Sequence, residues 1–468
     1  MEVMGQVNRY PLDAAVDLPE PPKKLSSMIG PSLVLLGLGL GSGEIILWPY
    51  MASNYGLGIV WAIVVGISMQ FFINMEVERY ALIYGESIFV GFARWLKVLP
   101  LWFILSTFIG FGWPGIGLAG SALLSSAFSI GQTKYVAMGM FILIGLILSL
   151  GKQLYTTVET LQKYLITIGS PAIVLLALIL AKPTDWQALG VGLLGQGNGY
   201  SFLPAGLAMS TFLGALAFAG AGGNLNLAQS FYVRDKGYGM GKFAARIKSL
   251  FTDKTADQEA KLAGRTFPLT ELNLARFRHW WRMVNLEHFL IFWLLGLITI
   301  VMLSLLAFTT AYGQPSNPEG IKFVINEAAD IGQKLAPMIG TLFLLATGLM
   351  LAATQLTVLD STSRIITENL ILLRGVNVAR ISRLYYIVLW AQIVFGVAII
   401  FSGRAQPRDL IVLSACINGF AMFVYTALIM YLNNTRLEKP LRPSLWRNAV
   451  LAGTFVFYGI FVFLTVRG

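Results

Sequence analysis

The sequence predicts an all-α integral membrane protein of about eleven transmembrane helices, because of its composition, its apolar runs and the placement of its basic residues. Of the 468 residues, 56% are hydrophobic and 12% are charged, whereas a soluble domain carries roughly 25% charged residues. A soluble protein this apolar could not cover its surface with polar groups, so lipid must cover much of it. Runs of about 20 apolar residues recur along the chain, and this length crosses a bilayer as a helix.

The apolar runs are separated by shorter polar segments and preceded by one longer polar segment. The first 27 residues are polar and rich in proline, which is typical of a cytoplasmic tail. The longest internal polar segment, residues 233–280, is basic and is expected to be a cytoplasmic loop. Its stretch from Gly241 to Phe251 predicts either a basic amphipathic helix on the inner leaflet or a solvated loop. The predicted spans are residues 28–54, 57–80, 101–128, 134–150, 154–181, 205–232, 283–309, 334–362, 384–402, 409–432 and 446–465.

The basic residues between these spans predict the orientation of the chain. With the N-terminus placed inside, 27 of the 34 Lys and Arg residues fall in inside segments and 7 fall outside. Cytoplasmic loops of membrane proteins carry such an excess of Lys and Arg. We therefore expect a multi-pass protein of the cell (inner) membrane, with a cytoplasmic N-terminus and, after an odd number of spans, an outside C-terminus.

Composition also excludes several classes of function. The net charge is +11, but the basic residues lie in loops between apolar runs, which is a membrane pattern rather than a nucleic-acid-binding patch. Cys416 is the single cysteine, so a disulfide framework and a cysteine-based metal site are both excluded. No enzymatic activity, catalytic residue or cofactor is predicted, and a monomer in the lipid bilayer is expected.

Two of the predicted spans carry a glycine-rich break in the middle. The first span holds four glycines between Gly37 and Gly43, and the sixth holds three between Gly220 and Gly223. Glycine inside a helix costs roughly 1 kcal/mol against alanine. In lipid, an interrupted backbone is tolerated only where it is buried in protein or lines a cavity. The other explanation for these glycines is close helix packing through small residues.

The spacing of the two breaks predicts an internal repeat. They lie five spans apart, as expected if spans one to five and six to ten form two halves of inverted topology. Paired glycine-interrupted segments in matching places point to the binding site of a transporter. The first repeat is predicted over residues 28–181 and the inverted second repeat over 205–432, with residues 446–465 added as helix eleven.

Glu44 is the ionisable residue that follows directly on the first break. A carboxylate near the middle of the membrane is costly and usually functional, and backbone amides at the start of a half-helix favour an anion there. Glu44 is predicted to bind a cation or carry a coupling proton, unless it only caps the outer half-helix. With Asn224 in the facing break it forms the predicted metal ligands. The predicted substrate site comprises Gly41, Ser42, Gly43, Glu44, Phe218, Ala221, Asn224, Gln355 and Asn418.

Some of these polar residues, and two charged clusters, also have a purely structural explanation. Asn224, Gln355 and Asn418 taken one at a time are more often interhelical hydrogen-bonding groups than ligands. A salt bridge or snorkelling explains the cluster at the inner end of span two. The cluster at the inner end of span eight is a candidate gate. The first cluster comprises Glu76, Glu78 and Arg79, and the second comprises Asp360, Arg364 and Glu368.

The chain resembles the natural resistance-associated macrophage protein (Nramp) family of divalent-metal transporters. The resemblance rests on Gly30-Pro31 ahead of the first break, on Leu351 to Gln355 in span eight and on Asp409 to Ser414 in span ten, and it covers most of the chain. It implies the 5+5 inverted-repeat fold of the amino-acid/polyamine/organocation superfamily, with discontinuous helices one and six. It also implies secondary transport of a divalent cation by alternating access.

The metal-ligand positions of that family are largely replaced here. The helix-one motif Asp-Pro-Gly-Asn falls on Gly41 to Glu44, so the aspartate is lost and a glutamate replaces the asparagine. The helix-six motif Met-Pro-His-Asn falls on Ala221 to Asn224, which removes the methionine and the histidine, and the helix-ten glutamine falls on Ala415. A thioether favours softer metals, whereas carboxylate and neutral oxygens suit a hard cation. The resemblance therefore extends to Nramp-related magnesium transporters, with Mg²⁺ or Mn²⁺ as the expected cargo.

Two other functions fit parts of the same sequence. The breaks also resemble those of amino-acid transporters in the superfamily, in which free amides at a half-helix end bind the substrate carboxylate. An amino acid or another small organic solute is therefore the alternative cargo, although Glu44 would repel a carboxylate or bind an amine. A non-transporting membrane receptor would need a folded soluble domain, and residues 233–280 are few for one.

Overall fold

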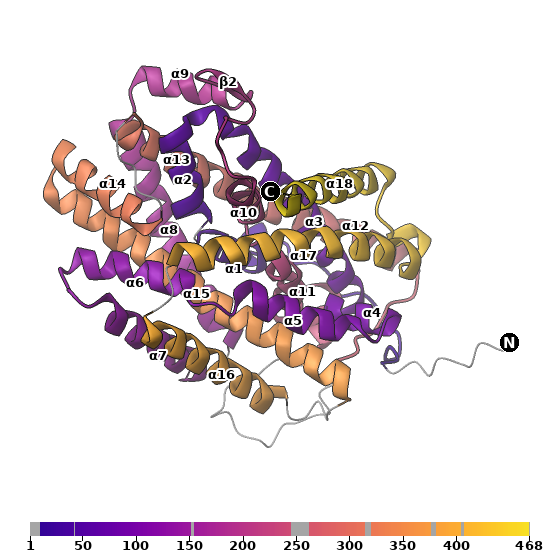
Figure 1. Ribbon diagram of the computed structural model, residues 1–468. Coiled ribbons are helices and arrows are strands. Elements are labelled where there is room, and N and C mark those ends of the chain that lie inside the picture. The colour runs from indigo at the N-terminus through magenta and orange to yellow at the C-terminus, as the bar shows by residue number, and fades with distance from the viewer. Residues whose placement is uncertain are drawn as a thin grey trace.

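The computed structural model is a bundle of long helices (Figure 1). Within the described ranges, the strands are confined to one short antiparallel hairpin of β1 (Gln196–Gly197) and β2 (Tyr200–Ser201). This architecture confirms the predicted all-α class. The structure describes residues 10–41, 43–150, 154–244, 262–313, 320–375, 381–403 and 407–467.

Nine helical segments of the described chain are long and apolar enough to cross a membrane, and they coincide with predicted spans two to five and seven to eleven. Span three is interrupted at Gly112, and span seven contains the π-helical segment η7 (Phe289–Leu295). The remaining helices of these spans are α3 (Trp61–Tyr84), α5 (Leu99–Phe111), α6 (Gly115–Ala127), α7 (Thr133–Leu150), α8 (Leu154–Leu180), α12 (Glu271–His288), α13 (Gly296–Ala311), α15 (Pro337–Arg374), α16 (Ile381–Ser402), α17 (Pro407–Arg436) and α18 (Leu445–Arg467).

The first predicted span is a bent pair of helices. α1 (Pro31–Gly39) is followed by the π-helical segment η2 (Gly43–Leu47) and by α2 (Trp48–Tyr55). The two parts turn by 44° at the break. The break therefore lies at the glycine cluster that the sequence analysis identified.

The sixth predicted span is divided in the same way. α10 (Met209–Ala217) and α11 (Gln229–Lys236) are each too short to cross a membrane alone. Between them lie an unwound stretch and the 3-10 helix η4 (Gly223–Ala228). This divided helix lies where the sixth span is predicted, and both breaks are confirmed.

Shorter helices connect the spans. They cap the two ends of the bundle, with α9 and α14 at the end opposite α4 (Figure 1). They are η1 (Leu25–Ser27), η3 (Leu57–Ile59), α4 (Ile88–Trp95), α9 (Pro183–Gly192), η5 (Gly239–Phe243), α14 (Ile321–Lys334) and η9 (Lys439–Leu441).

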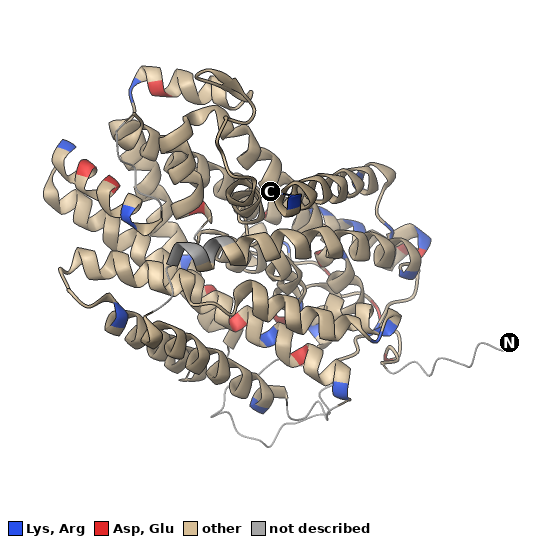
Figure 2. Ribbon diagram, viewed as in Figure 1, with Lys and Arg blue, Asp and Glu red and all other residues tan. Residues whose placement is uncertain are grey.

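The spans divide into an inner and an outer group. The protein buries 67% of the apolar window of α3 and 72% of that of α15, but only 28% of that of α8 and 22% of that of α18. Apolar side chains on the outer group, such as Ile168 in α8 and Phe463 in α18, are more than half exposed. Lipid must cover these faces. Charged residues lie mainly at helix ends and in connecting segments (Figure 2).

The predicted loop over residues 233–280 is shorter in the structure, because helices extend into it from both sides. α11 continues to Lys236, and α12 already begins at Glu271, where the Thr270 hydroxyl accepts a hydrogen bond from the Asn273 backbone N–H. The predicted amphipathic helix between Gly241 and Phe251 lies mostly outside the described residues, because residues 245–261 are not among them.

The N-terminal segment, described from Tyr10 onward, is packed against the bundle. Leu18 is fully buried, and its carbonyl accepts a 3.0 Å hydrogen bond from Arg276 of α12. The indole of Trp280 donates to the Pro19 carbonyl at 2.8 Å. Arg94 of α4 donates to the Tyr10 carbonyl at 2.7 Å. The segment predicted as a tail therefore ties α4 to α12 at this end of the molecule.

The connecting helix α14 carries a glutamate that predicts a pH-dependent stability. Burial, together with the smaller effect of the neighbouring charge of Asp330, raises the pKa of Glu327 from 4.5 to about 8. Because the folded protein holds a proton that the unfolded chain releases, the free energy of unfolding falls as the pH rises from 4.5 to about 8. In thermal melts across this range, Glu327→Gln is expected to remove that fall. An identical pH dependence in both proteins would contradict this assignment.

Candidate cation site

The break in the first span is held by a threonine from α15. The Thr354 hydroxyl lies 3.0 Å from the carbonyl oxygens of both Gly37 and Leu40, which the end of α1 leaves without helical partners. The same threonine lies against Gly41, where an added Cβ would meet its methyl carbon at 2.7 Å. Ser42, a predicted site residue, lies outside the described residues.

The break in the sixth span is held by a glutamine from α3. Gln70 donates to the carbonyls of Leu216 and Ala217, at 3.3 and 3.2 Å, and accepts from the Gly222 amide at 3.0 Å. One side chain therefore satisfies backbone groups on both sides of the unwound stretch. Gly222 and its neighbour Gly223 have φ values of 74° and 46°, a left-handed region that glycine adopts without strain.

The two breaks face each other at very short range. An added Cβ on Gly43 would lie 2.3 Å from the Cβ of Phe218 and 2.4 Å from its carbonyl oxygen. An added Cβ on Gly39 would lie 3.1 Å from the Cα of Gly220. Glycine is thus required at position 43, because any side chain there would force the half-helices apart, and the contact at Gly39 is tight.

This close approach predicts that Gly43→Ala disrupts the site. The new methyl group would meet a backbone carbonyl that cannot move away cheaply, and overpacking of this kind typically costs about 1–3 kcal/mol or more. We expect a lower melting temperature and loss of transport. The matched control is Gly453→Ala in α18, where nothing lies within 4 Å of the new Cβ. That variant should be as stable as the parent or slightly more stable, and a Gly43→Ala protein equal to it would contradict the packing described.

Glu44 points from η2 back into the space between the breaks. Its carboxylate Oε1 lies 3.3 Å from the position that a Cβ on Gly39 would occupy. The residue is fully buried, and neither carboxylate oxygen has a hydrogen-bond partner among the described residues. An ionised carboxylate buried without a partner is very costly. The group must therefore take up a proton or a cation.

The other predicted polar residues are arranged around α5 and α6. Asn224 donates from its amide to the hydroxyls of Ser106 and Thr107 in α5, at 2.8 and 2.9 Å, while its Oδ1 has no partner among the described residues. Asn418 of α17 donates to the Gly110 carbonyl at 3.1 Å. Gln355 of α15 accepts from the Gly117 amide of α6 at 2.9 Å. Gln355 thus serves as an interhelical hydrogen-bonding group.

The predicted apolar positions are buried beside the break. Phe218 lies next to Phe111 of α5, with ring centroids 6.1 Å apart, and lines a cavity of ≈ 10 Å³, about the space of one water molecule. Ala221 is buried in the unwound stretch. Ala415, where a family glutamine was expected, meets Gly214 of α10, since a Cβ added there would lie 2.9 Å from the alanine methyl.

A second group of buried polar side chains, not among the predicted site residues, links α1, α3 and the junction of α12 with η7. Glu287 accepts a hydrogen bond from the Ser32 hydroxyl, whose oxygen lies 2.7 Å from Nδ1 of His288. Glu78 is fully buried and is bound by Gln229 of α11 at 3.4 Å. A salt bridge or snorkelling, the explanation predicted for the cluster at the inner end of span two, therefore does not account for Glu78. Its neighbour in the sequence, Arg79, does pair with Glu76 as expected.

The predicted gate cluster joins α15 to α11. Arg364 contacts Asp235 at 2.5 Å and Asp360 at 2.9 Å, and Glu368 contacts Arg234 at 3.1 Å. All five side chains are buried. Arg234 and Asp235 fall within the predicted loop, whereas the structure places them at the end of α11. The inner half of the divided span is thus fastened to α15 by ion pairs.

The described residues contain no group of three or more His, Cys, Asp or Glu side chains that could hold a metal ion. A cation at Glu44 would therefore have one carboxylate and otherwise neutral oxygens as ligands. Carbonyl oxygens of the breaks, such as that of Phe218 beside Gly43, are the nearby source of such oxygens. This donor chemistry fits a hard divalent cation that keeps part of its hydration shell.

Comparison with solved structures identifies the fold. The manganese transporter of Eremococcus coleocola, solved as mutants and in complex with an aromatic bis-isothiourea substituted compound, aligns with 97% of this chain and 89% of its own at 15% identity, with a TM-score of 0.62. The chain has the fold of a membrane transporter. It is the 5+5 inverted-repeat fold with discontinuous helices one and six, as the sequence predicted.

Two other solved transporters align with the chain at lower TM-scores. MhsT in complex with L-phenylalanine aligns at 13% identity over 93% of this chain and 97% of its own, with a TM-score of 0.46. Mhp1, a nucleobase-cation-symport-1 family transporter, aligns at 13% identity over 97% and 92%, with a TM-score of 0.48. Both scores are too low to support an argument. No family model and no curated protein sequence matches the chain.

Proposed function

We propose that this chain is a secondary transporter that moves a divalent cation, Mg²⁺ or Mn²⁺, across the cell membrane by alternating access, as a divergent relative of the Nramp family. The observation that carries the proposal is the Glu44 carboxylate, fully buried between two broken helices with neither oxygen partnered among the described residues. A passing cation would supply the charge that this carboxylate lacks. The likeness to a manganese transporter supports the same class of cargo.

The donor atoms near Glu44 favour a hard cation. In the facing break, Ala221 and Gly223 stand where the resembled family has methionine and histidine, so neither a thioether nor an imidazole is available there. Carboxylate, amide and carbonyl oxygens remain. Small side chains in the breaks would leave space for water on the ion once the half-helices separate, as Mg²⁺ usually retains several waters.

Alternating access would require the ion pairs between α11 and α15, at the inner end of the bundle, to break and re-form. α11 continues directly from the break and is fastened to α15 through Arg364 and Asp235. Opening a path from Glu44 to the inside requires that these pairs separate. The buried group of Ser32, Glu78 and Glu287 lies beside the same helices and would provide polar surface along that path.

The breaks offer little for the alternative cargo. An amino-acid carboxylate would need free backbone amides, but the Gly222 amide is already bound by Gln70, and the Ile45 amide donates to the Gly41 carbonyl at 2.9 Å. Glu44 would in addition repel the substrate carboxylate.

Transport by the purified protein in liposomes tests the proposal. We expect saturable uptake of Mg²⁺ or Mn²⁺ that is lost in Glu44→Gln. Uptake of neither ion, or uptake that is indifferent to this substitution, would overturn the metal proposal. Saturable uptake of an amino acid that survives chelation of divalent ions would establish the alternative instead.

A further inference from the structure

A pocket of ≈ 370 Å³ lies at the end of α3 on the side predicted to face the cytoplasm, and none of the residues that line it belongs to the proposed cation site. Its walls come from Arg79 at the end of α3, from one face of α12, and from the segment that joins α17 to α18. This volume falls in the range of sites that bind small molecules. The pocket therefore has the size of a binding site outside the transport path.

The pocket is strongly basic. Four arginines line it, Arg79, Arg278, Arg442 and Arg447, and the lining contains no carboxylate. Glu76, just behind the wall, is shared by two of them, at 2.7 Å from Arg79 and 3.2 Å from Arg447. One negative charge thus faces four positive ones, which leaves a surplus of three positive charges at the pocket.

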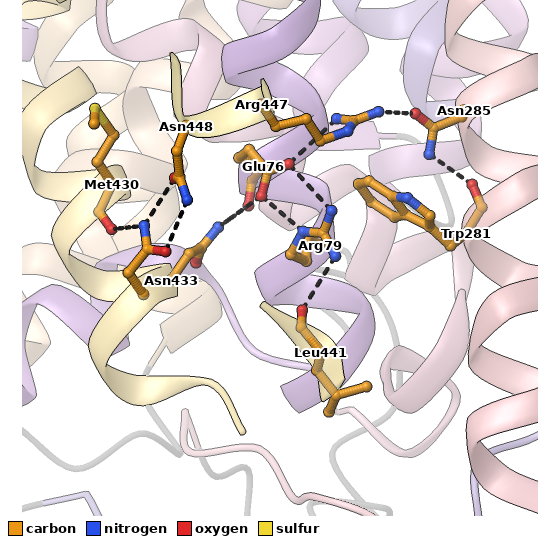
Figure 3. Close-up of polar contacts among 10 residues, drawn as sticks. Glu76, Arg79, Trp281, Asn285, Met430, Asn433, Leu441, Arg447 and Asn448 are labelled. Carbon is orange, nitrogen blue, oxygen red and sulfur yellow. Dashed lines mark hydrogen bonds and ion pairs between the residues drawn. The ribbon is translucent and has the colours of Figure 1, made fainter. Parts of the chain in front are cut away.

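The two inner arginines are held rigidly in place (Figure 3). Arg79 also donates to the Leu441 carbonyl at 3.1 Å, and its guanidinium lies 3.9 Å from the centre of the Trp281 ring. Arg447 donates to the amide oxygen of Asn285 at 2.5 Å and lies 4.8 Å from the same ring. Their positions are therefore fixed before any ligand arrives, which lowers the cost of binding.

The two outer arginines are available to a ligand. Arg278 is exposed and makes no hydrogen bond or ion pair with any other described residue. Arg442 is also exposed and donates from its Nε to the Leu437 carbonyl at 2.7 Å, while its two terminal nitrogens have no hydrogen-bond partner among the described residues. Guanidinium groups bind phosphate through paired, charge-assisted hydrogen bonds. The arrangement therefore suits a phosphate group that enters from the exposed side.

Apolar residues at the rim connect the pocket to the lipid phase. Leu445 and Trp446, at the start of α18, are 88% and 54% exposed, although they lie at the end of a membrane-spanning helix. Tryptophan is enriched at the level of lipid headgroups. A ligand with a phosphate in the pocket and acyl chains along α18 would cover both the charges and these apolar side chains.

We infer that this pocket binds the phosphate headgroup of an anionic phospholipid of the inner leaflet. Basic pockets between transmembrane helices on the cytoplasmic side are suited to anionic headgroups. Such a lipid would fasten α18, which buries little of its surface in the protein, to α3 and α12. The inference depends on the predicted orientation and is independent of which substrate the protein carries.

Native mass spectrometry of the purified full chain with added phosphatidylglycerol or phosphatidylcholine tests the inference. The site variant is Arg278→Gln with Arg442→Gln, and the matched control is Arg374→Gln with Arg383→Gln, two exposed arginines elsewhere on the predicted cytoplasmic side. We expect phosphatidylglycerol to bind in preference to phosphatidylcholine, and the site variant to weaken this binding about 30-fold. The control should bind as the parent protein does.

Equal effects of the two double substitutions, or no effect of either, would overturn the inference, because the binding would then reflect general surface charge. All four substituted side chains are exposed, so the variants should fold, and a thermal melt checks this. A second experiment measures the melting temperature of both proteins with added inorganic phosphate. If phosphate raises the melting temperature saturably in the parent and not in the site variant, while phosphatidylglycerol shows no preference over phosphatidylcholine, the ligand is a soluble phosphate and the lipid proposal is wrong.

Discussion

Glu44→Gln is expected to abolish saturable divalent-cation uptake while leaving the folded protein at least as stable as the parent. The substitution keeps the shape of the side chain but removes the charge that would hold the cation. Because neither carboxylate oxygen has a partner among the described residues, no hydrogen bond or ion pair seen in the structure is lost. Uptake into liposomes and thermal melting in the absence of divalent ions measure the two effects.

Uptake and thermal stability of Glu44→Gln together distinguish a cation ligand from a structural glutamate. A structural glutamate would lose stability when changed, whereas a cation ligand loses affinity. The control is Glu20→Gln, which removes the ion pair of this 78% exposed carboxylate with Arg276 at 3.0 Å and leaves the two breaks unchanged. Exposed pairs contribute about 0–1 kcal/mol, so this variant should transport normally. If Glu44→Gln instead melts well below the parent and transports normally when folded, Glu44 has a structural role.

Arg364→Gln is expected to have the largest effect on stability. It leaves the buried carboxylates of Asp235 and Asp360 without the guanidinium that contacts both. Removing one partner of a buried ion pair typically costs about 3–5 kcal/mol. The free energy of unfolding should fall by this order, and the inner half-helix α11 should separate from α15 more readily. Denaturation in detergent, followed by intrinsic fluorescence, measures the first effect.

A double substitution separates this ion pair from general damage. Adding Asp235→Asn to Arg364→Gln removes one of the two carboxylates that Arg364 contacts, and the other partner of Asp235 is Arg234 at 3.1 Å. The double variant should therefore be less destabilised than the sum of the single variants. The control is Glu20→Gln, because this carboxylate is 78% exposed and contacts Arg276 at 3.0 Å. It should change the free energy of unfolding by less than about 1 kcal/mol. Strict additivity, or a control as damaging as Arg364→Gln, would contradict the described network.

The parts of this account that could be predicted from sequence are those with a local signal. Glycine within an apolar run is visible in a single segment, and this is why both breaks were located correctly. Glu44 stands out for the same reason, because it directly follows such a run of glycines. The spans were predicted because helices in lipid must be long and apolar regardless of their neighbours.

The side chains that hydrogen-bond to the backbone at the breaks could not be predicted in the same way. Gln70 and Thr354 are single polar residues in long apolar helices, and only the packing of α3 and α15 shows which backbone groups they meet. Arg234 and Asp235 were assigned to a loop because tertiary contacts, here ion pairs to α15, decide where α11 ends. The pairing of Glu287 with Ser32 likewise joins positions 255 residues apart.

Crystals grown with Mn²⁺ would test the central claim most directly, because manganese can be located by its anomalous scattering. The account predicts a peak between the two breaks, within about 2.0–2.6 Å of a Glu44 carboxylate oxygen, and no such peak in Glu44→Gln. A peak elsewhere, or none in protein shown to transport Mn²⁺, would contradict the claim that Glu44 and the facing breaks form the cation site.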